Sequence, residues 1–266
     1  MKTVIYYFTG TGNTLAVARD LAAELGDTTL IPLRQAMHYG GYAPEADAVG
    51  IAFPVYFLDM PPIVRRFVFN ILFQGSPFIF GLATCGERPG GALFRLQELL
   101  LEKGYTLSAG YALVMPENYI GPVDLMGDAG RREEKFAVAR RSIPAIAKAI
   151  RERRATAPEG SNSALLKLGG RITSALATSV YNTPGHLHAT DACNRCGMCS
   201  MICPTRNITV SKAKVAFGDE CTQCYACIHW CPRGAVEIGG RTAGKPRYHH
   251  PDIMLADMLD QRGRPR

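Results

Sequence analysis

Two cysteine runs between residues 193 and 232 decide how this chain is organised. CNRCGMCSMICP spans residues 193–204, and CTQCYACIHWCP spans residues 221–232. Each run spaces three cysteines two residues apart and adds a fourth after three more residues, followed directly by proline. The eight cysteines are Cys193, Cys196, Cys199, Cys203, Cys221, Cys224, Cys227 and Cys231. A doubled motif of this length predicts metal binding by thiolates.

The spacing resembles that of the bacterial two-cluster ferredoxins, in which the fourth cysteine of each run ligates the cluster of the other run. The resemblance implies two [4Fe–4S] clusters. One cluster then takes Cys193, Cys196, Cys199 and Cys231, and the other takes Cys221, Cys224, Cys227 and Cys203. The proline after each fourth cysteine fixes φ and removes a backbone N–H, which turns the chain away from the cluster.

Zinc and disulfide bonds are the alternative uses of these cysteines. Zinc sites typically take two well-separated pairs of ligands, which gives no reason for a triplet plus a distant Cys-Pro. Disulfides belong to secreted chains, and the apolar run after Lys2 is too short for a signal peptide and lacks a cleavage site. The sequence therefore favours iron–sulfur clusters. With no span of about 20 apolar residues to cross a bilayer, it also predicts a cytoplasmic location.

Short alternating segments follow the two Cys-Pro pairs. Ile208-Thr209-Val210 and Val236-Glu237-Ile238 have apolar residues at every second position. This pattern predicts two strands, which we expect to pair with each other. The segment as a whole predicts a small α+β domain that is stabilised mainly by its metal.

The N-terminus predicts a strand followed by an anion-binding loop. The apolar run of residues 3–8 leads directly into TGTGNT, and apolar residues then recur at helical spacing up to Gly26. A Gly/Thr loop at a helix N-terminus offers backbone N–H groups and hydroxyls to a phosphate. A nucleotide P-loop would need lysine at Asn13, and a dinucleotide fingerprint would need glycine at Leu15. The loop residues are Thr9, Gly10, Thr11, Gly12, Asn13 and Thr14.

This loop resembles the phosphate loop of flavodoxins, Thr-x-Thr-Gly-Asn-Thr, which implies FMN as its ligand. Four further β-rich runs alternate with helical segments over the first 150 residues. These runs span residues 28–32, 48–54, 78–84 and 107–115. The alternation predicts an α/β fold with a doubly wound, parallel, five-stranded sheet of order 2-1-3-4-5.

Two more loops should meet the phosphate loop, because the carboxyl ends of parallel strands share one edge of the sheet. In flavodoxins the corresponding loops clasp the isoalloxazine ring. The expected FMN-binding residues here are Pro54, Val55, Tyr56, Phe57, Thr84, Cys85, Gly86, Gly90 and Gly91. Residues 87–91 depart from the acidic and aromatic residues usual in flavodoxins. Cys85 either packs in the core or lies beside the flavin. Residues 116–119 either cover the flavin or lead into the next helix.

The basic residues concentrate in the middle of the chain. The net charge is +7, and residues 131–190 carry 11 Lys/Arg against 4 Asp/Glu. The expected helix over residues 131–154 then has either a solvated face or a landing site for an acidic carrier. Nucleic acid is not expected, since Phe136 is the one aromatic in residues 131–171. A basic tail from Gln261 to Arg266 is expected to be disordered.

The sequence thus predicts a flavodoxin-like domain in residues 1–155, a helical connector in 156–188, and a ferredoxin domain with its tail in 189–266. This arrangement resembles the flavodoxin–ferredoxin fusion proteins of anaerobes. The resemblance implies electron transfer between FMN and two clusters, a low-potential donor and an acceptor protein. No residue set predicts a catalytic acid, base or nucleophile, although an FMN-dependent reductase fed by its own ferredoxin domain is the alternative. A homodimer is left open.

Overall fold

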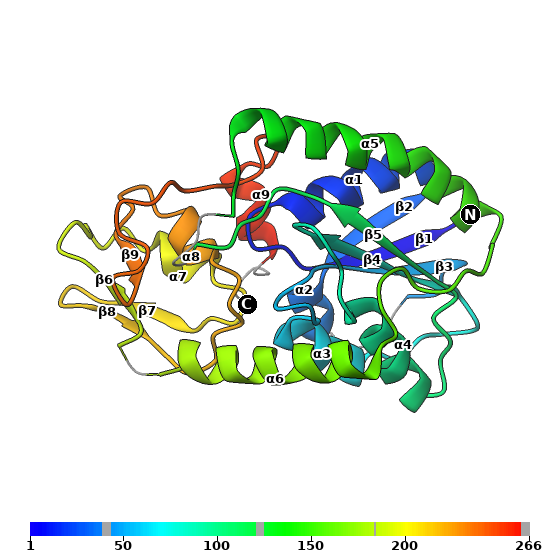
Figure 1. The fold of residues 1–266 in the computed structure, drawn as a ribbon, viewed down its shortest axis with the longest axis horizontal. Coiled ribbons are helices and arrows are strands. Elements are labelled where there is room, and N and C mark those ends of the chain that lie inside the picture. The colour runs from blue at the N-terminus through cyan, green and yellow to red at the C-terminus, as the bar shows by residue number, and fades with distance from the viewer. Residues whose placement is uncertain (39–43, 121–124, 184, 262–266) are drawn as a thin grey trace.

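A five-stranded parallel sheet forms the centre of the N-terminal domain (Figure 1). The computed structural model describes residues 1–38, 44–120, 125–183 and 185–261. The strands are β1 (Thr3–Tyr7), β2 (Thr28–Pro32), β3 (Ala48–Pro54), β4 (Phe78–Cys85) and β5 (Ala109–Val114). Their order is β2-β1-β3-β4-β5, which confirms the predicted topology. The central strands are buried throughout, as parallel strands covered on both faces must be.

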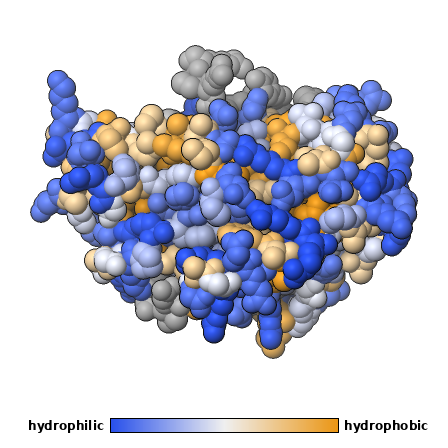
Figure 2. Space-filling model, turned by 90° about the horizontal axis from the view of Figure 1, so that it is seen from above, coloured by the Kyte–Doolittle hydropathy of each residue, from blue (hydrophilic) through white to orange (hydrophobic). Residues whose placement is uncertain are grey.

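Helices cover both faces of this sheet (Figure 1). On one face α1 (Asn13–Leu25) packs against α5 (Ala129–Arg151), and on the other α3 (Pro62–Asn70) packs against α4 (Ala92–Glu102). A short helix, α2 (Leu33–His38), was not expected from the sequence. Figure 2 shows the molecule from above, on the face that includes α5. This face is mostly hydrophilic, with hydrophobic residues scattered between the polar ones.

The small domain has two strand pairs, and its pairing differs from the prediction. β6 (Leu187–Ala189) pairs with β9 (Val236–Ile238), while β7 (Ile208–Val210) pairs with β8 (Val215–Phe217). The expected pairing of 208–210 with 236–238 was therefore wrong. Each missed strand precedes a cysteine run, and the two missed strands are related by the same offset of 28 residues as the runs. The domain is completed by α7 (Met198–Ile202) and α8 (Ala226–His229).

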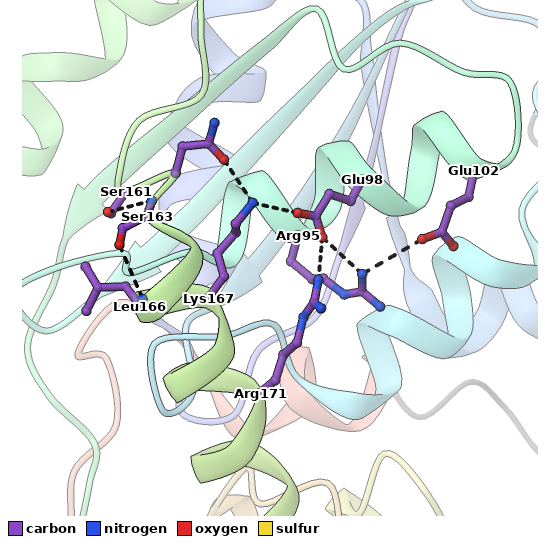
Figure 3. A network of polar contacts seen from close by, with 9 residues as sticks. Arg95, Glu98, Glu102, Ser161, Ser163, Leu166, Lys167 and Arg171 are labelled. Atoms are coloured by element: carbon purple, nitrogen blue, oxygen red, sulfur yellow. Dashed lines mark hydrogen bonds and ion pairs between the residues drawn. The ribbon is translucent and has the colours of Figure 1, made fainter.

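The connector helix α6 (Ala164–Tyr181) runs from the sheet domain to the small domain (Figure 1). Glu98 of α4 holds the first half of α6 in place. The Glu98 carboxylate accepts hydrogen bonds from Lys167 at 2.8 Å and from Arg171 at 2.6 Å (Figure 3). At the other end, Gln223 Nε2 donates to Thr178 Oγ1 at 2.8 Å. The helix therefore ties the second cysteine run to the sheet domain.

Replacing Glu98 by glutamine should loosen α6. The side chain is about one-third exposed, and Arg95 also pairs with it at 3.1 Å. We expect the local stability of α6 to fall by about 1 kcal/mol, seen as faster hydrogen exchange of its amides. Glu102→Gln is the matched control, because Glu102 makes one exposed pair at 3.9 Å. Equal exchange in both variants would contradict this role for Glu98.

Acid should weaken the same contact. Partial burial opposes ionisation, but the hydrogen bonds from Lys167 and Arg95 hold the pKa of Glu98 below its ordinary value. A lowered carboxyl pKa contributes stability that is present above the ordinary pKa and is lost as the pH falls through the lowered one. Exchange of α6 should therefore accelerate on acidification in the wild type, and less so in Glu98→Gln.

The C-terminal segment returns to the sheet domain, which the sequence did not predict. After the small domain, α9 (Leu255–Gln261) packs beside the phosphate loop, and Ile253 and Met258 join the core of the sheet domain. Gln261, expected to begin a disordered tail, is 2% exposed. The remainder of that tail, 262–266, lies outside the described residues. No helix in the described ranges combines the length and apolar character that a membrane crossing requires.

Candidate redox sites

The first predicted cysteine set surrounds one cavity of the small domain. Cys193, Cys196, Cys199 and Cys231 all line a space of about 300 Å³. Cys196 is exposed and Cys199 is buried, so this cavity lies at the surface. Burial, followed by the nearby sulfurs of Cys231, Cys193 and Cys196, raises the pKa of Cys199 to about 11.

The second predicted set surrounds a deeper cavity. Cys203, Cys221, Cys224 and Cys227 line a space of about 430 Å³, together with Gln223 and Tyr225. Burial, and then the neighbouring thiol of Cys203, raises the pKa of Cys224 above its ordinary value. Four thiolates in such a place need positive charge among them, which the iron atoms of a cluster would supply.

The two cavities have the same backbone hydrogen bonds to cysteine sulfurs, at positions 28 residues apart. The backbone N–H of Arg195 donates to Cys193 Sγ at 3.4 Å, and that of Gln223 donates to Cys221 Sγ at the same distance. The backbone N–H groups four residues after the fourth cysteines also donate to sulfur. That of Asn207 donates to Cys203 Sγ and that of Ala235 donates to Cys231 Sγ, both at 3.3 Å. N–H groups aimed at cysteine sulfurs tune the potential of iron–sulfur clusters.

The cysteines encircle their cavities without converging on a point. In the described part of the chain, no three His, Cys, Asp or Glu side chains gather closely enough to hold a single metal ion. A zinc ion would need four ligands within about 2.3 Å of one centre. A cubane of four irons and four sulfides takes four thiolates from around a larger core, and four of the cysteines line each cavity.

The phosphate loop has the features of an anion site. Gly12 adopts a left-handed conformation, φ 101°, which opens the N-terminus of α1, and its N–H donates to Thr9 Oγ1 at 3.0 Å. Among the described residues, the backbone N–H groups of Thr11, Asn13 and Thr14 have no hydrogen-bond partner. The loop lines a space of about 330 Å³, and none of the described residues that line this space is basic. Backbone amides and the helix dipole would therefore hold the phosphate.

A larger cleft of about 1270 Å³ opens beside the phosphate loop. Val55, Tyr56, Cys85 and Gly86 line both spaces, so the cleft continues from the loop as a ribityl chain and ring system would require. Pro54 and Thr84 line the loop side, and Phe57 lines the cleft side. The expected flavin residues are thus brought together, apart from three glycines.

Gly12, Gly90 and Gly91 do not line either space. Gly12 is the helix cap, and a Cβ on it would meet Ile253 at 2.9 Å. Gly90 and Gly91 lie against Leu58, with the N–H of Gly91 donating to its carbonyl oxygen at 3.1 Å. A side chain on Gly90 would collide with Leu58, so this glycine has a structural role. The expected place of these glycines beside the flavin stays a prediction.

Glu87, Arg88, Glu117, Asn118 and Tyr119 line the cleft from the loops of residues 87–91 and 116–119, which the sequence had set beside the flavin, and Leu58 lines it next to the expected Phe57. Four further lining residues were missed from the sequence: Leu125, Lys135, Gln223 and Tyr225. Gln223 and Tyr225 come from the second cysteine run, which no periodicity places near the sheet. One signal in the sequence indicated the role of Tyr225. At the repeat offset of 28 residues, Tyr225 corresponds to Gly197, and both residues have a positive φ, 57° and 83°. A bulky residue at a position that favours glycine indicates that its side chain is needed there.

A carboxyl group, that of Glu117, and an ammonium group, that of Lys135, both line the cleft. Burial raises the pKa of Glu117, opposed by Lys135 and reinforced by Glu87. The Lys135 ammonium donates to the carbonyl oxygen of Gly86 at 2.7 Å, and a Cβ on Gly86 would overlap the Glu117 carboxylate. Cys85 beside them has its pKa raised to about 12, mainly by burial, so its thiol is protonated.

The C-terminal segment holds the phosphate loop from outside. The Gln261 side chain accepts from the N–H of Thr9 at 2.6 Å and donates to its carbonyl oxygen at 2.9 Å. The Tyr248 hydroxyl donates to Asn13 Oδ1 at 2.5 Å. These residues are 252 and 235 positions apart in sequence. The loop is therefore positioned by the last part of the chain.

The phosphate loop and the second cysteine run are in direct contact. A Cβ added to Gly10 would lie 2.2 Å from the carbonyl oxygen of Cys224 and 3.0 Å from the Tyr56 hydroxyl. Tyr56 is buried, and its pKa is raised by burial and then by the thiols of Cys224 and Cys221. Only a residue without a side chain permits this approach at Gly10.

Comparison with known proteins supports the small domain directly. Residues 187–232 match the family Fer4_10, a 4Fe-4S dicluster domain. No curated protein matches the chain. The chain therefore joins a ferredoxin-type iron–sulfur domain to a sheet with the flavodoxin strand order.

Several solved structures resemble parts of the chain. A putative flavoprotein from Bacteroides uniformis ATCC 8492 is 23% identical over 42% of this chain and 90% of its own, with a TM-score of 0.35. The flavodoxin of Streptococcus pneumonia TIGR4 is 16% identical over 57% of this chain and 98% of its own, with a TM-score of 0.38. Rubredoxin oxygen:oxidoreductase from the anaerobe Desulfovibrio gigas is 19% identical over 58% and 37%, with a TM-score of 0.35.

Proposed function

We propose that this chain is an electron-transfer protein that relays electrons between two [4Fe–4S] clusters and one FMN. Cluster I would be held by Cys193, Cys196, Cys199 and Cys231, and cluster II by Cys203, Cys221, Cys224 and Cys227. The phosphate of FMN would bind at residues 9–14, with its ring system in the adjoining cleft. Redox partner proteins would supply and remove the electrons.

The observation that carries this proposal is that the cluster II cavity and the flavin cleft share two lining residues. Gln223 and Tyr225 line both the cluster II cavity and the cleft. Gly10 of the phosphate loop also touches the backbone of Cys224. Electron tunnelling weakens steeply with distance, so a cluster one side chain away from the flavin cleft is well placed for transfer.

The cofactors would supply the redox chemistry, and the protein would supply placement. A flavin exchanges one or two electrons, whereas a [4Fe–4S] cluster exchanges one. Together they would couple one-electron transfer to two-electron transfer. The chain's own groups would fix the loop at Gly10, bury part of cluster II around Cys203 and Cys224, and aim the N–H groups of Asn207 and Gln223 at its sulfurs.

Anaerobic purification followed by iron, sulfide and flavin analysis tests the cofactor content. We expect about eight irons, about eight sulfides and one FMN per chain. A stepwise reductive titration should then show both cluster and flavin bands bleaching. Zinc in place of iron, or FAD or no flavin in place of FMN, would refute the assignment.

Gln261 gives a sharper test of the flavin site. Replacing it by alanine leaves the buried N–H and carbonyl of Thr9 without partners, which costs about 1–3 kcal/mol. We expect the apoprotein to bind FMN about 10-fold more weakly, measured by quenching of FMN fluorescence. Asp260→Asn is the control, since Asp260 is exposed and makes no hydrogen bond in the described structure. Equal affinity in Gln261→Ala and the control would contradict the role of Gln261.

A flavin-dependent reductase is the second candidate function. The observation that favours it is that Glu117, whose pKa is raised by burial, and Lys135 both line the open cleft, where either could donate a proton to a substrate as it is reduced. Such an enzyme would still need electrons from the clusters. Oxidation of the reduced protein by a panel of quinones and nitroaromatics, with and without Glu117→Gln, separates the two functions.

A further inference from the structure

The two cluster cavities differ in access from solvent. Cys196 is an exposed ligand of the cluster I cavity, whereas Cys203 and Cys224 of the cluster II cavity are buried. Tyr181 of α6 lines the cluster II cavity, and Gln223 and Tyr225 line both that cavity and the cleft. An outside protein can therefore approach cluster I and cannot approach cluster II as closely.

Two arginines stand at the mouth of the cluster I cavity. Arg195 and Arg233 both line it and both are exposed. Neither guanidinium has an ion-pair or hydrogen-bond partner within the described residues. The residues described as lining this cavity include no aspartate or glutamate. The mouth therefore presents unpaired positive charge.

The internal repeat provides a control within the same chain. At the offset of 28 residues, Gln223 corresponds to Arg195 and Thr205 corresponds to Arg233. Both counterparts line the buried cluster II cavity. The same scaffold thus carries neutral residues where it is covered and arginines where it is open, so cluster binding alone does not require the positive charge.

More basic residues lie next to the same mouth. The turn between β7 and β8 contains Lys212 and Lys214, both exposed. Val210 and Val215, which flank this turn, line the cluster I cavity. The β7–β8 turn lies at the end of the molecule away from the sheet domain (Figure 1), so the exposed Lys212 and Lys214 add positive charge beside the cavity.

The basic residues of α5 are less available. Arg140 pairs with Asp252 at 2.5 Å, and Arg151 donates to the carbonyl oxygen of Glu24 at 2.6 Å. Just after this helix, Arg153 donates to the carbonyl oxygen of Asp47 at 2.9 Å. Much of the charge of α5 therefore holds the fold together, whereas Arg195 and Arg233 at the cluster I cavity are unpaired within the described residues.

We propose that an acidic one-electron carrier protein docks over cluster I, guided by Arg195, Arg233, Lys212 and Lys214. The inference rests on the proposed function and adds the partner class and its landing site. One electron passes from the reduced carrier to cluster I, which leaves the carrier oxidised and the cluster reduced, with no atom transferred. Complementary charge raises the rate of encounter and makes it sensitive to salt.

The test compares two charge-matched variants of the holoprotein in anaerobic stopped flow. Arg195→Gln/Arg233→Thr gives the cluster I mouth the residues found at cluster II. Arg131→Gln/Arg141→Gln removes the same charge from exposed positions on α5. The reductants are a reduced acidic [2Fe–2S] ferredoxin and the reduced methyl viologen cation, each at several ionic strengths.

At low ionic strength the ferredoxin should reduce the clusters about 10-fold more slowly in the Arg195/Arg233 variant, and the salt dependence should flatten. The α5 variant should change by less than about two-fold, and reduction by methyl viologen should not slow. An equal loss in both variants would refute the landing site, as would a salt-independent wild type. Slowing with methyl viologen as well would indicate an altered cluster potential and would also refute docking. Clusters that are reduced without flavin reduction would contradict the relay and leave the docking site standing.

Discussion

Replacing Cys224 by alanine should separate the flavin from the clusters. Cys224 is buried, lines the cluster II cavity and contacts the phosphate loop through its backbone. We expect iron to fall from about eight to about four per chain, because cluster II loses a ligand while cluster I keeps all of its own. Reduction of the flavin through cluster I should then slow by about 100-fold or more, since the intermediate carrier is missing.

Stopped-flow absorbance and iron analysis together check this result. The FMN content should stay near one, because the backbone of Cys224, which touches Gly10, is unchanged. Met201→Ala is the control, since Met201 lies within the first cysteine run, is exposed, and lines neither cluster cavity nor the flavin cleft. A Cys224→Ala protein that keeps eight irons, or that reduces its flavin at the wild-type rate, would contradict the assignment of cluster II.

Replacing Gly10 by alanine should damage the flavin site and the domain contact together. The new Cβ would lie 2.2 Å from the Cys224 carbonyl oxygen, a backbone atom that cannot move without shifting the second cysteine run. Overpacking of this kind costs about 1–3 kcal/mol. We expect FMN affinity to fall by about 10- to 100-fold, and transfer between cluster II and flavin to slow.

The matched control for this substitution is Gly169→Ala. Gly169 lies in α6, and a Cβ there would meet nothing within 4 Å. Alanine in a helix is more favourable than glycine by about 1 kcal/mol, so the control should be neutral or slightly stabilising. FMN titration of the two apoproteins measures the difference. Unchanged FMN affinity in Gly10→Ala would show that the close approach does not shape the site.

Local patterns in the sequence were sufficient for the main architecture. The apolar runs of β3 and β4 and the loop of residues 9–14 predicted the parallel sheet and its ligand edge, because buried parallel strands and anion loops have short-range signatures. The cysteine spacing predicted the dicluster domain that the family match supports. Both features are encoded within a few tens of residues.

Features that depend on distant residues were not predictable in this way. Gln261 holds Thr9 from 252 residues away, and nothing in α9 alone specifies that partner. All four strands of the small domain have three residues, too few to specify which strand pairs with which, so the pairing of β6 with β9 and of β7 with β8 depends on contacts between distant residues. Tyr225 reaches the cleft only because the small domain is fixed against the sheet domain.

Single-turnover kinetics test the central claim most directly. The protein is reduced by a substoichiometric amount of reduced ferredoxin, and the cluster and flavin bands are followed separately at several protein concentrations. The account predicts that the clusters are reduced first and that flavin reduction follows with a rate independent of protein concentration, as required for transfer within one chain. A flavin rate that rises in proportion to protein concentration would mean that electrons pass between molecules, and it would contradict the relay.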